Sequence, residues 1–332
     1  MTVDGLYDLF CDALESLALQ PGQQLVAALG GGADSQTVLD LLMRYRRQHP
    51  QYDYLAIHLD HSFHPSSADW SSTIEEAAKA YGIPTIFEPL DVPVANRQSK
   101  EAAGREVRYQ RMAELTQNDA VLLLGQHRND QIETFFLQLK RGSGPKGLSS
   151  MASIQAWTGK RRLCRPLLSV SKEQILDYAT QRNLTWIEDD TNYDTSIERN
   201  FLRHDVVPVL EQRWPQFGQS VLRAAKLCAE QQQVMDELLL EKLHNQQSHT
   251  HHFPILLLNQ SSEAMQRALL RTWLQEQKKP LPSYEQLEQI RRQALTASDD
   301  SQLQIQCDGY VVRYFQHALW CDVKVAELPG DS

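Results

Sequence analysis

The chain has 332 residues, of which 42% are apolar and 23% are charged, and its formal net charge is −9 at pH 7. This length predicts two or three domains, and the apolar content excludes an intrinsically disordered protein. No apolar run reaches membrane-spanning length and no secretory signal opens the chain, so we expect no membrane partner. The five cysteines are odd in number, widely spaced and without a CxxC pair, from which we expect the reducing cytoplasm.

The predicted elements alternate between helices and strands. An amphipathic helix opens the chain, because Leu6, Phe10 and Leu14 recur at helical spacing. Short apolar runs predict buried strands at residues 25–29, 54–59, 84–87, 120–124 and 163–168, with helical segments between them. This alternation predicts an α/β fold in which helices cover both faces of a parallel sheet. Such sheets bind ligands beyond the carboxyl ends of their strands.

Changes in sequence character indicate the domain boundaries. Ser171 and Gln174 have capping-box spacing before a helix at residues 172–182. A long helix is expected at residues 221–244, and the polar stretch 245–252 has the composition of a linker. We therefore expect an α/β domain at residues 1–215, a connecting helix and linker at 216–250, and a small mixed helical and strand domain at 251–325.

The most distinctive local motif is the sequence LVAALGGGADS at residues 25–35. Here a buried strand is followed by a glycine turn, and a helix begins after the turn. Glycines allow backbone N–H groups to surround a phosphate, and the N-terminus of a helix attracts anions. Asp34 fits such a loop if Mg²⁺ bridges its carboxylate and the phosphates. The alternative is a plain turn with Asp34 or Ser35 as the helix cap. The loop is neither a Walker A motif nor a GxGxxG motif.

A second polar segment, GQHRNDQIET at residues 125–134, follows the strand at 120–124 and therefore lies at the same edge of the sheet. Asp130 and Glu133 share a helix face and are candidates to bind Mg²⁺ or an ammonium group. The alternative is that both acids only complement the helix dipole. Arg105 and Arg108 share a face of an earlier helix, for which a solvated surface is the alternative.

A basic segment offers the best candidate surface for RNA. The net negative charge of the chain argues against a nucleic-acid partner, but the distribution of charge matters more than its sum. The segment runs from residue 140 to residue 165 and contains no acidic residue. The alternative interpretation is a solvated basic loop. Its basic residues are Lys140, Arg141, Lys146, Lys160, Arg161, Arg162 and Arg165.

Together and in this order, these segments resemble the bacterial tRNA(Ile)-lysidine synthetases. The family's SGGxDS phosphate loop corresponds to GGGADS at residues 30–35, and its HxDDQxET segment to HRNDQIET at 127–134. Its basic GSGxxGL loop lies within KRGSGPKGLSSM at 140–151. Further matches are the HxxH-type segment from His58 to His61, the ExxxRxxRY pattern from Glu101 to Tyr109, the RPLL segment at 165–168, and the WIEDxxN and RNxxR segments within 186–203.

Two positions depart from the family pattern. Gly30 replaces the loop serine, which removes a hydroxyl donor to phosphate, and Asn129 replaces the first aspartate of the DD pair, which removes a negative charge. Many relatives also carry a further C-terminal domain for the acceptor arm of the tRNA, and this sequence ends without one.

The resemblance implies a PP-loop ATP-pyrophosphatase domain at residues 1–215, a small substrate-binding domain at residues 251–325, and a two-step reaction. ATP adenylates carbon 2 of the wobble cytidine in a CAU anticodon of tRNA(Ile), and the ε-amine of free L-lysine then displaces AMP. ATP and Mg²⁺ are the expected cofactors.

We assign candidate roles to the matching residues. Asp34, Asp130 and Glu133 are expected to be catalytic, with Asp34 also binding the metal. The expected phosphate loop comprises Gly30, Gly31, Gly32, Ala33, Asp34 and Ser35. Candidates on the nucleotide or tRNA side are His58, His61, Arg105, Arg108, His127, Lys140, Arg141, Lys146 and Arg203.

Two rival interpretations and one structural question stay open. A tRNA 2-thiolation enzyme of the same class should show catalytic or cluster-binding cysteines, whereas the α/β domain here has only Cys11 and Cys164, and the chain has no CxxC pair. A degenerate relative that binds nucleotide or tRNA without catalysis would fit Gly30 and Asn129. The oligomeric state is open, and a homodimer is one option.

Overall fold

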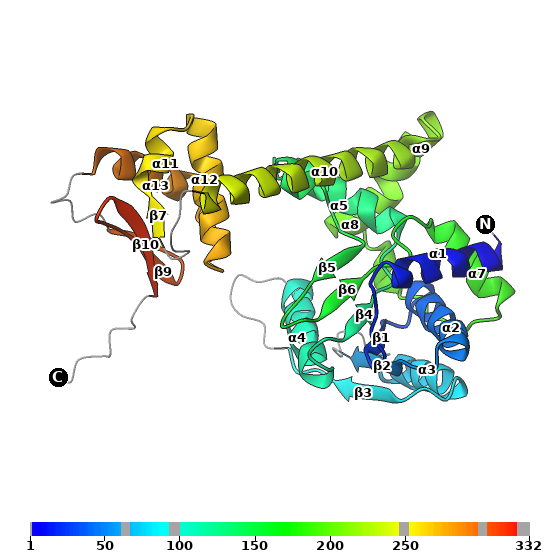
Figure 1. Cartoon of the computed structure of the whole chain (residues 1–332). Helices are drawn as coiled ribbons and strands as arrows, with labels where there is room; N and C mark the ends of the chain where they lie inside the picture. Colours follow the sequence, from blue (N-terminus) through cyan, green and yellow to red (C-terminus); the bar gives the residue numbers. More distant parts are fainter. Residues whose placement is uncertain (1, 61–66, 93–99, 246–251, 298–303, 324–332) are drawn as a thin grey trace, which may run out of the picture. The chain divides into compact units, whose positions relative to one another are not determined.

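The structure is a computed structural model that describes residues 2–60, 67–92, 100–245, 252–297 and 304–323 (Figure 1). The chain divides into two units, Met1–Ala229 and Glu230–Ser332. The division falls within one long helix, α10 (Phe217–His244).

A six-stranded sheet in the order β3-β2-β1-β4-β6-β5 forms the centre of the first unit. All neighbours pair in parallel except β5 and β6, so the predicted parallel α/β sheet is confirmed. Strand β5 was not predicted, because three residues are too few to show a period, and β6 is shorter than the predicted 163–168. The strands are β1 (Gln24–Leu29), β2 (Asp53–Asp60), β3 (Thr85–Pro89), β4 (Val121–Leu123), β5 (Ile154–Ala156) and β6 (Arg162–Cys164).

Helices cover both faces of this sheet because alternate side chains of each buried strand point to opposite faces. In β1, Leu25 and Ala27 face one hydrophobic core, whereas Val26 faces another. The first core is completed by α1 (Val3–Glu15), α2 (Ala33–Gln48), α3 (Ser67–Ala80) and α7 (Lys172–Gln181), and the second by α4 (Lys100–Leu115) (Figure 1).

The strand order places a crevice at the carboxyl end of β1. The chain runs from β1 outward through β2 and β3 and then returns to β4 on the other side of β1. In parallel sheets, the loops after two such strands diverge and leave room for a ligand. The glycine turn after β1 and the polar segment after β4 therefore face the same crevice.

A buried carboxylate fixes α2 against α7. Asp40 of α2 accepts hydrogen bonds from the hydroxyls of Tyr81 and Tyr178 and from the guanidinium of Arg182. Burial alone would raise the pKa of Asp40, but these donors hold that pKa below its usual value. The relative position of the two helices is therefore set inside the core.

A π-helical turn interrupts the helical segment that follows the sheet. The turn spans Leu202–Val206, between α8 (Glu198–Phe201) and α9 (Val207–Arg213). Pro208 lacks the N–H group that would continue the normal hydrogen-bond ladder, which explains why the ladder widens here. The remaining elements of the first unit are α5 (Arg128–Lys140), α6 (Pro145–Leu148) and a 3-10 turn η1 (Asp190–Tyr193).

The second unit combines helices with a four-stranded antiparallel sheet in the order β7-β10-β9-β8, which confirms the expected mixture of helices and strands. Trp273, Tyr310 and Phe253 are fully buried at the centre of its core. None of the described helices is both long and apolar enough to span a membrane. The elements are β7 (His252–Pro254), α11 (Ile255–Asn259), α12 (Glu263–Glu276), α13 (Tyr284–Thr296), β8 (Gln304–Cys307), β9 (Tyr310–Phe315) and β10 (Ala318–Val323).

Candidate active site

The glycine turn after β1 is held in shape by backbone conformation and by Ser35. Gly31 has a φ of +87°, and a Cβ atom added there would lie 2.9 Å from the Cδ1 atom of Ile74. Ser35 donates its hydroxyl to the carbonyl of Gly32 and accepts the N–H of Gly30. No side chain caps the N-terminus of α2 at Gly32, so the first N–H groups of this helix are available to an anion.

The loop after β4 approaches this turn closely. A Cβ atom at Gly125 would lie 3.1 Å from the backbone and Cβ atoms of Asp34, which explains why glycine suits this position. His127 caps the next helix, because its Nδ1 atom accepts the N–H of Asn129. The remaining ring nitrogen of His127 lies 3.7 Å from Asp34 and 3.5 Å from Asp130.

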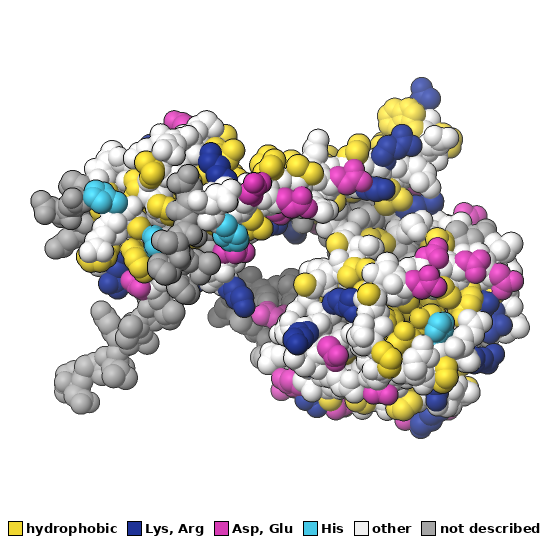
Figure 2. Space-filling view, in the orientation of Figure 1, with side chains coloured by type: hydrophobic (Ala, Val, Ile, Leu, Met, Phe, Trp, Pro, Cys, Tyr) yellow, Lys and Arg dark blue, Asp and Glu magenta, His cyan; other side chains and the backbone are white. Residues whose placement is uncertain are grey.

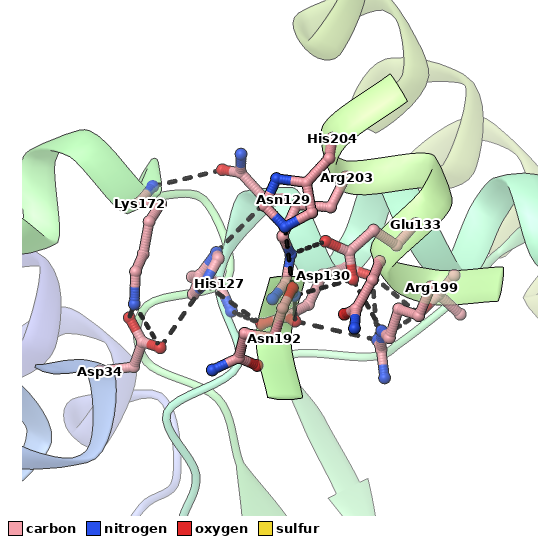
Figure 3. A network of polar contacts seen from close by, with 12 residues as sticks. Asp34, His127, Asn129, Asp130, Glu133, Lys172, Asn192, Arg199, Arg203 and His204 are labelled. Atoms are coloured by element: carbon pink, nitrogen blue, oxygen red, sulfur yellow. Dashed lines mark hydrogen bonds and ion pairs between the residues drawn. The ribbon is translucent and has the colours of Figure 1, made fainter. Parts of the chain in front are cut away.

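Lys172 brings a cation to the same point. Its Nζ atom lies 2.8 and 2.9 Å from the two carboxylate oxygens of Asp34, and the two side chains point toward each other from α7 and α2 (Figure 3). The backbone N–H of Lys172 donates to the side-chain oxygen of Asn129. Lys172 was not among the site residues predicted from the sequence.

Two arginines cover Glu133. Its carboxylate is 1% exposed and accepts hydrogen bonds from Nε of Arg199 and Nε of Arg203, both at 2.7 Å (Figure 3). Arg203 also reaches Asp130 at 3.5 Å. Glu133 lines neither of the two cavities described below, so the geometry favours a role in holding these arginines. Arg199 was the member of this cluster that was not predicted from the sequence.

Two cavities meet at these residues. The first, of about 370 Å³, extends from the glycine turn to α4, where Arg105, Arg108 and Tyr109 line it. The second, of about 330 Å³, extends toward the segment around Trp186 and the π turn. Gly32, Asp34 and Asp130 line both cavities. Two ligands can therefore meet beside the two carboxylates.

Some expected site residues lie elsewhere. Both ring nitrogens of His58 are engaged, one with the carbonyl of Leu29 and one with the hydroxyl of Ser71, and burial lowers its pKa. His58 therefore joins β1 to α3 as a neutral side chain and lines neither cavity. His61 lies outside the described residues.

Only some side chains of the basic segment are exposed and without internal contacts. Arg161, Arg162 and Arg165 donate to backbone carbonyls at 2.6 or 2.7 Å, and Lys140 pairs with Glu198. Arg161 binds the end of α4, Arg162 binds the turn after α1, and Arg165 binds the loop before β5. The exposed basic surface is therefore smaller than the seven predicted residues, and RNA binding by this segment stays a prediction. Within the described part of this segment, the exposed members without such a bond are Arg141, Lys146 and Lys160.

The cysteines do not contribute to either cavity. Cys164 is buried, and burial raises the pKa of its thiol to about 12, which keeps it protonated and unreactive. Neither Cys164 nor Cys11 lines a cavity. The site geometry therefore gives no support to a cysteine-dependent thiolation enzyme.

Comparisons with known proteins identify the family of the chain. A PP-loop domain model matches residues 9–210, and a model described as a TilS substrate binding domain matches residues 253–320. The tRNA(Ile)-lysidine synthase of Idiomarina loihiensis is 80% identical over 331 residues, which cover 100% of this chain and 74% of that protein. The chain belongs to the tRNA(Ile)-lysidine synthase family. A second member, from Vibrio cholerae serotype O1 (strain ATCC 39541 / Classical Ogawa 395 / O395), is 39% identical over 323 residues. These residues cover 97% of this chain and 73% of that protein.

A solved structure supports the fold alone. The U34-tRNA thiolase NcsA from Methanococcus maripaludis, with its 4Fe-4S cluster, has a TM-score of 0.58 and 18% sequence identity. The similarity covers 69% of this chain and 80% of that chain. It confirms the parallel-sheet fold class predicted from the alternation of strands and helices.

The structure explains one departure from the pattern of the tRNA(Ile)-lysidine synthase family. The side-chain oxygen of Asn129 accepts the first N–H of α7, at Lys172, with a donor–acceptor distance of 3.2 Å. An aspartate has an oxygen in the same place, so asparagine keeps this bond and loses only the charge.

Gly30, the other departure, should accept the family's serine. Its φ is not positive and an added Cβ atom meets no atom within 4 Å. One added hydrogen bond to a charged phosphate oxygen contributes about 1.5 kcal/mol, so Gly30→Ser should leave ATP turnover unchanged or raise it up to about tenfold. Pyrophosphate release at varied ATP concentration measures the effect. Gly31→Ser is the matched control and should lose turnover, because Gly31 has positive φ and a close neighbour.

Proposed function

We propose that the chain ligates L-lysine to carbon 2 of the wobble cytidine in the CAU anticodon of tRNA(Ile), and that ATP drives the reaction. The cytidine oxygen attacks the α-phosphorus, its bond to the bridging oxygen breaks, and pyrophosphate leaves. The lysine ε-amine then attacks carbon 2 and displaces AMP. The main support for this proposal is that Asp34 and Asp130 line both cavities.

The first cavity suits ATP. The uncapped N-terminus of α2 offers N–H groups and a positive dipole end to phosphates. Arg105 and Arg108 line the same cavity and add positive charge beside the glycine turn. Such groups would stabilise the negative charge that develops on the leaving pyrophosphate.

Asp34 is the residue that would hold Mg²⁺. Among the described residues, no group of three or more His, Cys, Asp or Glu side chains could hold a metal by itself. Mg²⁺ commonly binds through one or two carboxylates together with substrate phosphates, and Asp34 in the wall of the first cavity fits that arrangement. When bound, Mg²⁺ would neutralise negative charge on the phosphates.

The second cavity suits a lysine. Asp130, Glu188 and Asp189 line it and offer carboxylates to ammonium groups, whereas Arg203 offers a partner to the α-carboxylate. Trp186 provides an apolar wall for the methylene stem. A lysine in this cavity would reach the shared wall beside Asp34 and Asp130, where the adenylated base must lie.

The exposed basic residues should contribute to tRNA affinity. On the face of the first unit that Figure 2 shows, basic and acidic side chains are interspersed. Arg141, Lys146 and Lys160 are exposed and are therefore the candidates to contact RNA phosphates. Neutralising Arg141, Lys146 and Lys160 together should flatten the log–log salt dependence of tRNA binding by roughly 0.7–0.9 for each phosphate that is no longer neutralised. Binding measured over a salt series tests this, with ATP affinity unchanged and Lys79→Gln as control. An unaltered slope would contradict a role of these residues in RNA binding.

Pyrophosphate release with and without tRNA and lysine tests the function. The proposal expects release that requires tRNA, and a lysine-modified nucleoside only when lysine is present. Absence of release with all substrates would favour the degenerate relative instead. Three further predictions stay open. Cell fractionation tests action in the cytoplasm, and sedimentation tests the homodimer. Limited proteolysis tests the division of the chain at residues 215 and 250.

A further inference from the structure

Lys172 occupies the position beside Asp34 where a metal cation is expected. Its ammonium group contacts both carboxylate oxygens, at 2.8 and 2.9 Å. The two residues are far apart in sequence, and Lys172 belongs to none of the motifs that identify the phosphate loop. The carboxylate that we propose holds Mg²⁺ is thus already paired with a cation that the chain itself provides.

The backbone of Lys172 is fixed, whereas its side chain can move. Ser171 caps α7, Asn129 binds the N–H of Lys172, and the N–H of Arg128 binds the carbonyl of Val170 just before the helix. The side chain of Lys172 is 39% exposed and that of Asp34 is 26% exposed. A flexible four-carbon stem in a partly solvated ion pair can change partners at little cost.

We propose that Lys172 is a cation placeholder for Asp34 in the free protein and a ligand of the leaving pyrophosphate during catalysis. It neutralises Asp34 until nucleotide and its metal arrive, then turns its ammonium toward the phosphates. There it donates hydrogen bonds as the bond from the α-phosphorus to the bridging oxygen breaks and the pyrophosphate takes that electron pair. The second role rests on the proposed use of ATP.

The first experiment measures metal binding without nucleotide. Mn²⁺ replaces Mg²⁺ as a probe that electron paramagnetic resonance detects, and the variant is Lys172→Met, which keeps the length of the side chain. Losing the competing ammonium should tighten Mn²⁺ binding about two- to fivefold, in line with the small strength of a partly exposed ion pair. Lys79→Met is the matched control, because Lys79 forms an exposed ion pair with Glu75 on α3. Unchanged or weaker Mn²⁺ binding in Lys172→Met would overturn the placeholder role.

The second experiment measures pyrophosphate release by the same proteins with tRNA present. Lys172→Met should lower kcat about 10- to 100-fold, the effect of removing one hydrogen bond to a charged group, and Lys172→Arg should recover part of it. A merely structural lysine would weaken metal binding and turnover together, whereas this proposal expects them to change in opposite directions. A kcat within twofold of the unaltered protein overturns the ligand role. Absence of release from the unaltered protein would instead overturn the proposed function, while the Mn²⁺ result still tests the placeholder role.

Discussion

Asp34→Ala should reduce pyrophosphate release at least about a thousandfold, because the variant loses the carboxylate at the end of the glycine turn that would hold Mg²⁺ against the phosphates. The fold should persist. The ion pair of Asp34 with Lys172 is partly exposed and contributes under about 1 kcal/mol, so the melting temperature should change by less than about 4 °C.

A thermal melt and a pyrophosphate assay on the same preparation provide the measurement. Asp69→Ala is a suitable control, since Asp69 lies in the first turn of α3 and lines neither cavity. Near-normal turnover in a folded Asp34→Ala protein would remove Asp34 from the catalytic mechanism.

Glu133→Ala should lower stability and turnover together. The buried carboxylate holds Arg199 and Arg203, whose side chains are each 30% exposed. Removing one partner of a buried ion pair costs about 3 kcal/mol, which corresponds to a fall in melting temperature of about 6–12 °C for a unit of this size. Turnover should fall because Arg203 then loses its position beside Asp130.

Glu133→Gln separates a positioning role from a direct chemical role. Glutamine keeps the shape and one acceptor oxygen, so it should recover part of both the stability and the turnover that Glu133→Ala removes. A Glu133→Gln protein with a normal melt and no turnover would instead indicate that the carboxylate takes part in the chemistry. Glu198→Gln, at an exposed ion pair with Lys140, controls for loss of a surface charge and should change the melt little.

Sequence patterns predicted the parts of the molecule that depend on local order. The glycine turn with Asp34 and the segment with His127 and Asp130 each follow a strand, and parallel strands place such segments at one edge of the sheet. Capping-box spacing likewise predicted the start of α7 at Lys172. These predictions needed only periodicity, turn chemistry and the direction of the strands.

The contacts between distant segments could not be predicted in the same way. Nothing in a helical period states that the first residue of α7 meets the first turn of α2, because that contact depends on the order of strands in the sheet and on the Asp40 network. A run of basic residues likewise does not tell which side chains are used internally. Arg161 and Arg165 bind backbone carbonyls that come close only after folding.

If ATP and lysine occupy the two cavities as proposed, the wall that the cavities share couples the two binding equilibria. Because Asp34 and Asp130 line both spaces, an occupant of one changes the electrostatic free energy of an occupant of the other. Thermodynamic linkage then requires reciprocity: the factor by which the first ligand alters the affinity of the second equals the factor by which the second alters that of the first. An affinity for either ligand is therefore defined only when the concentration of the other is stated.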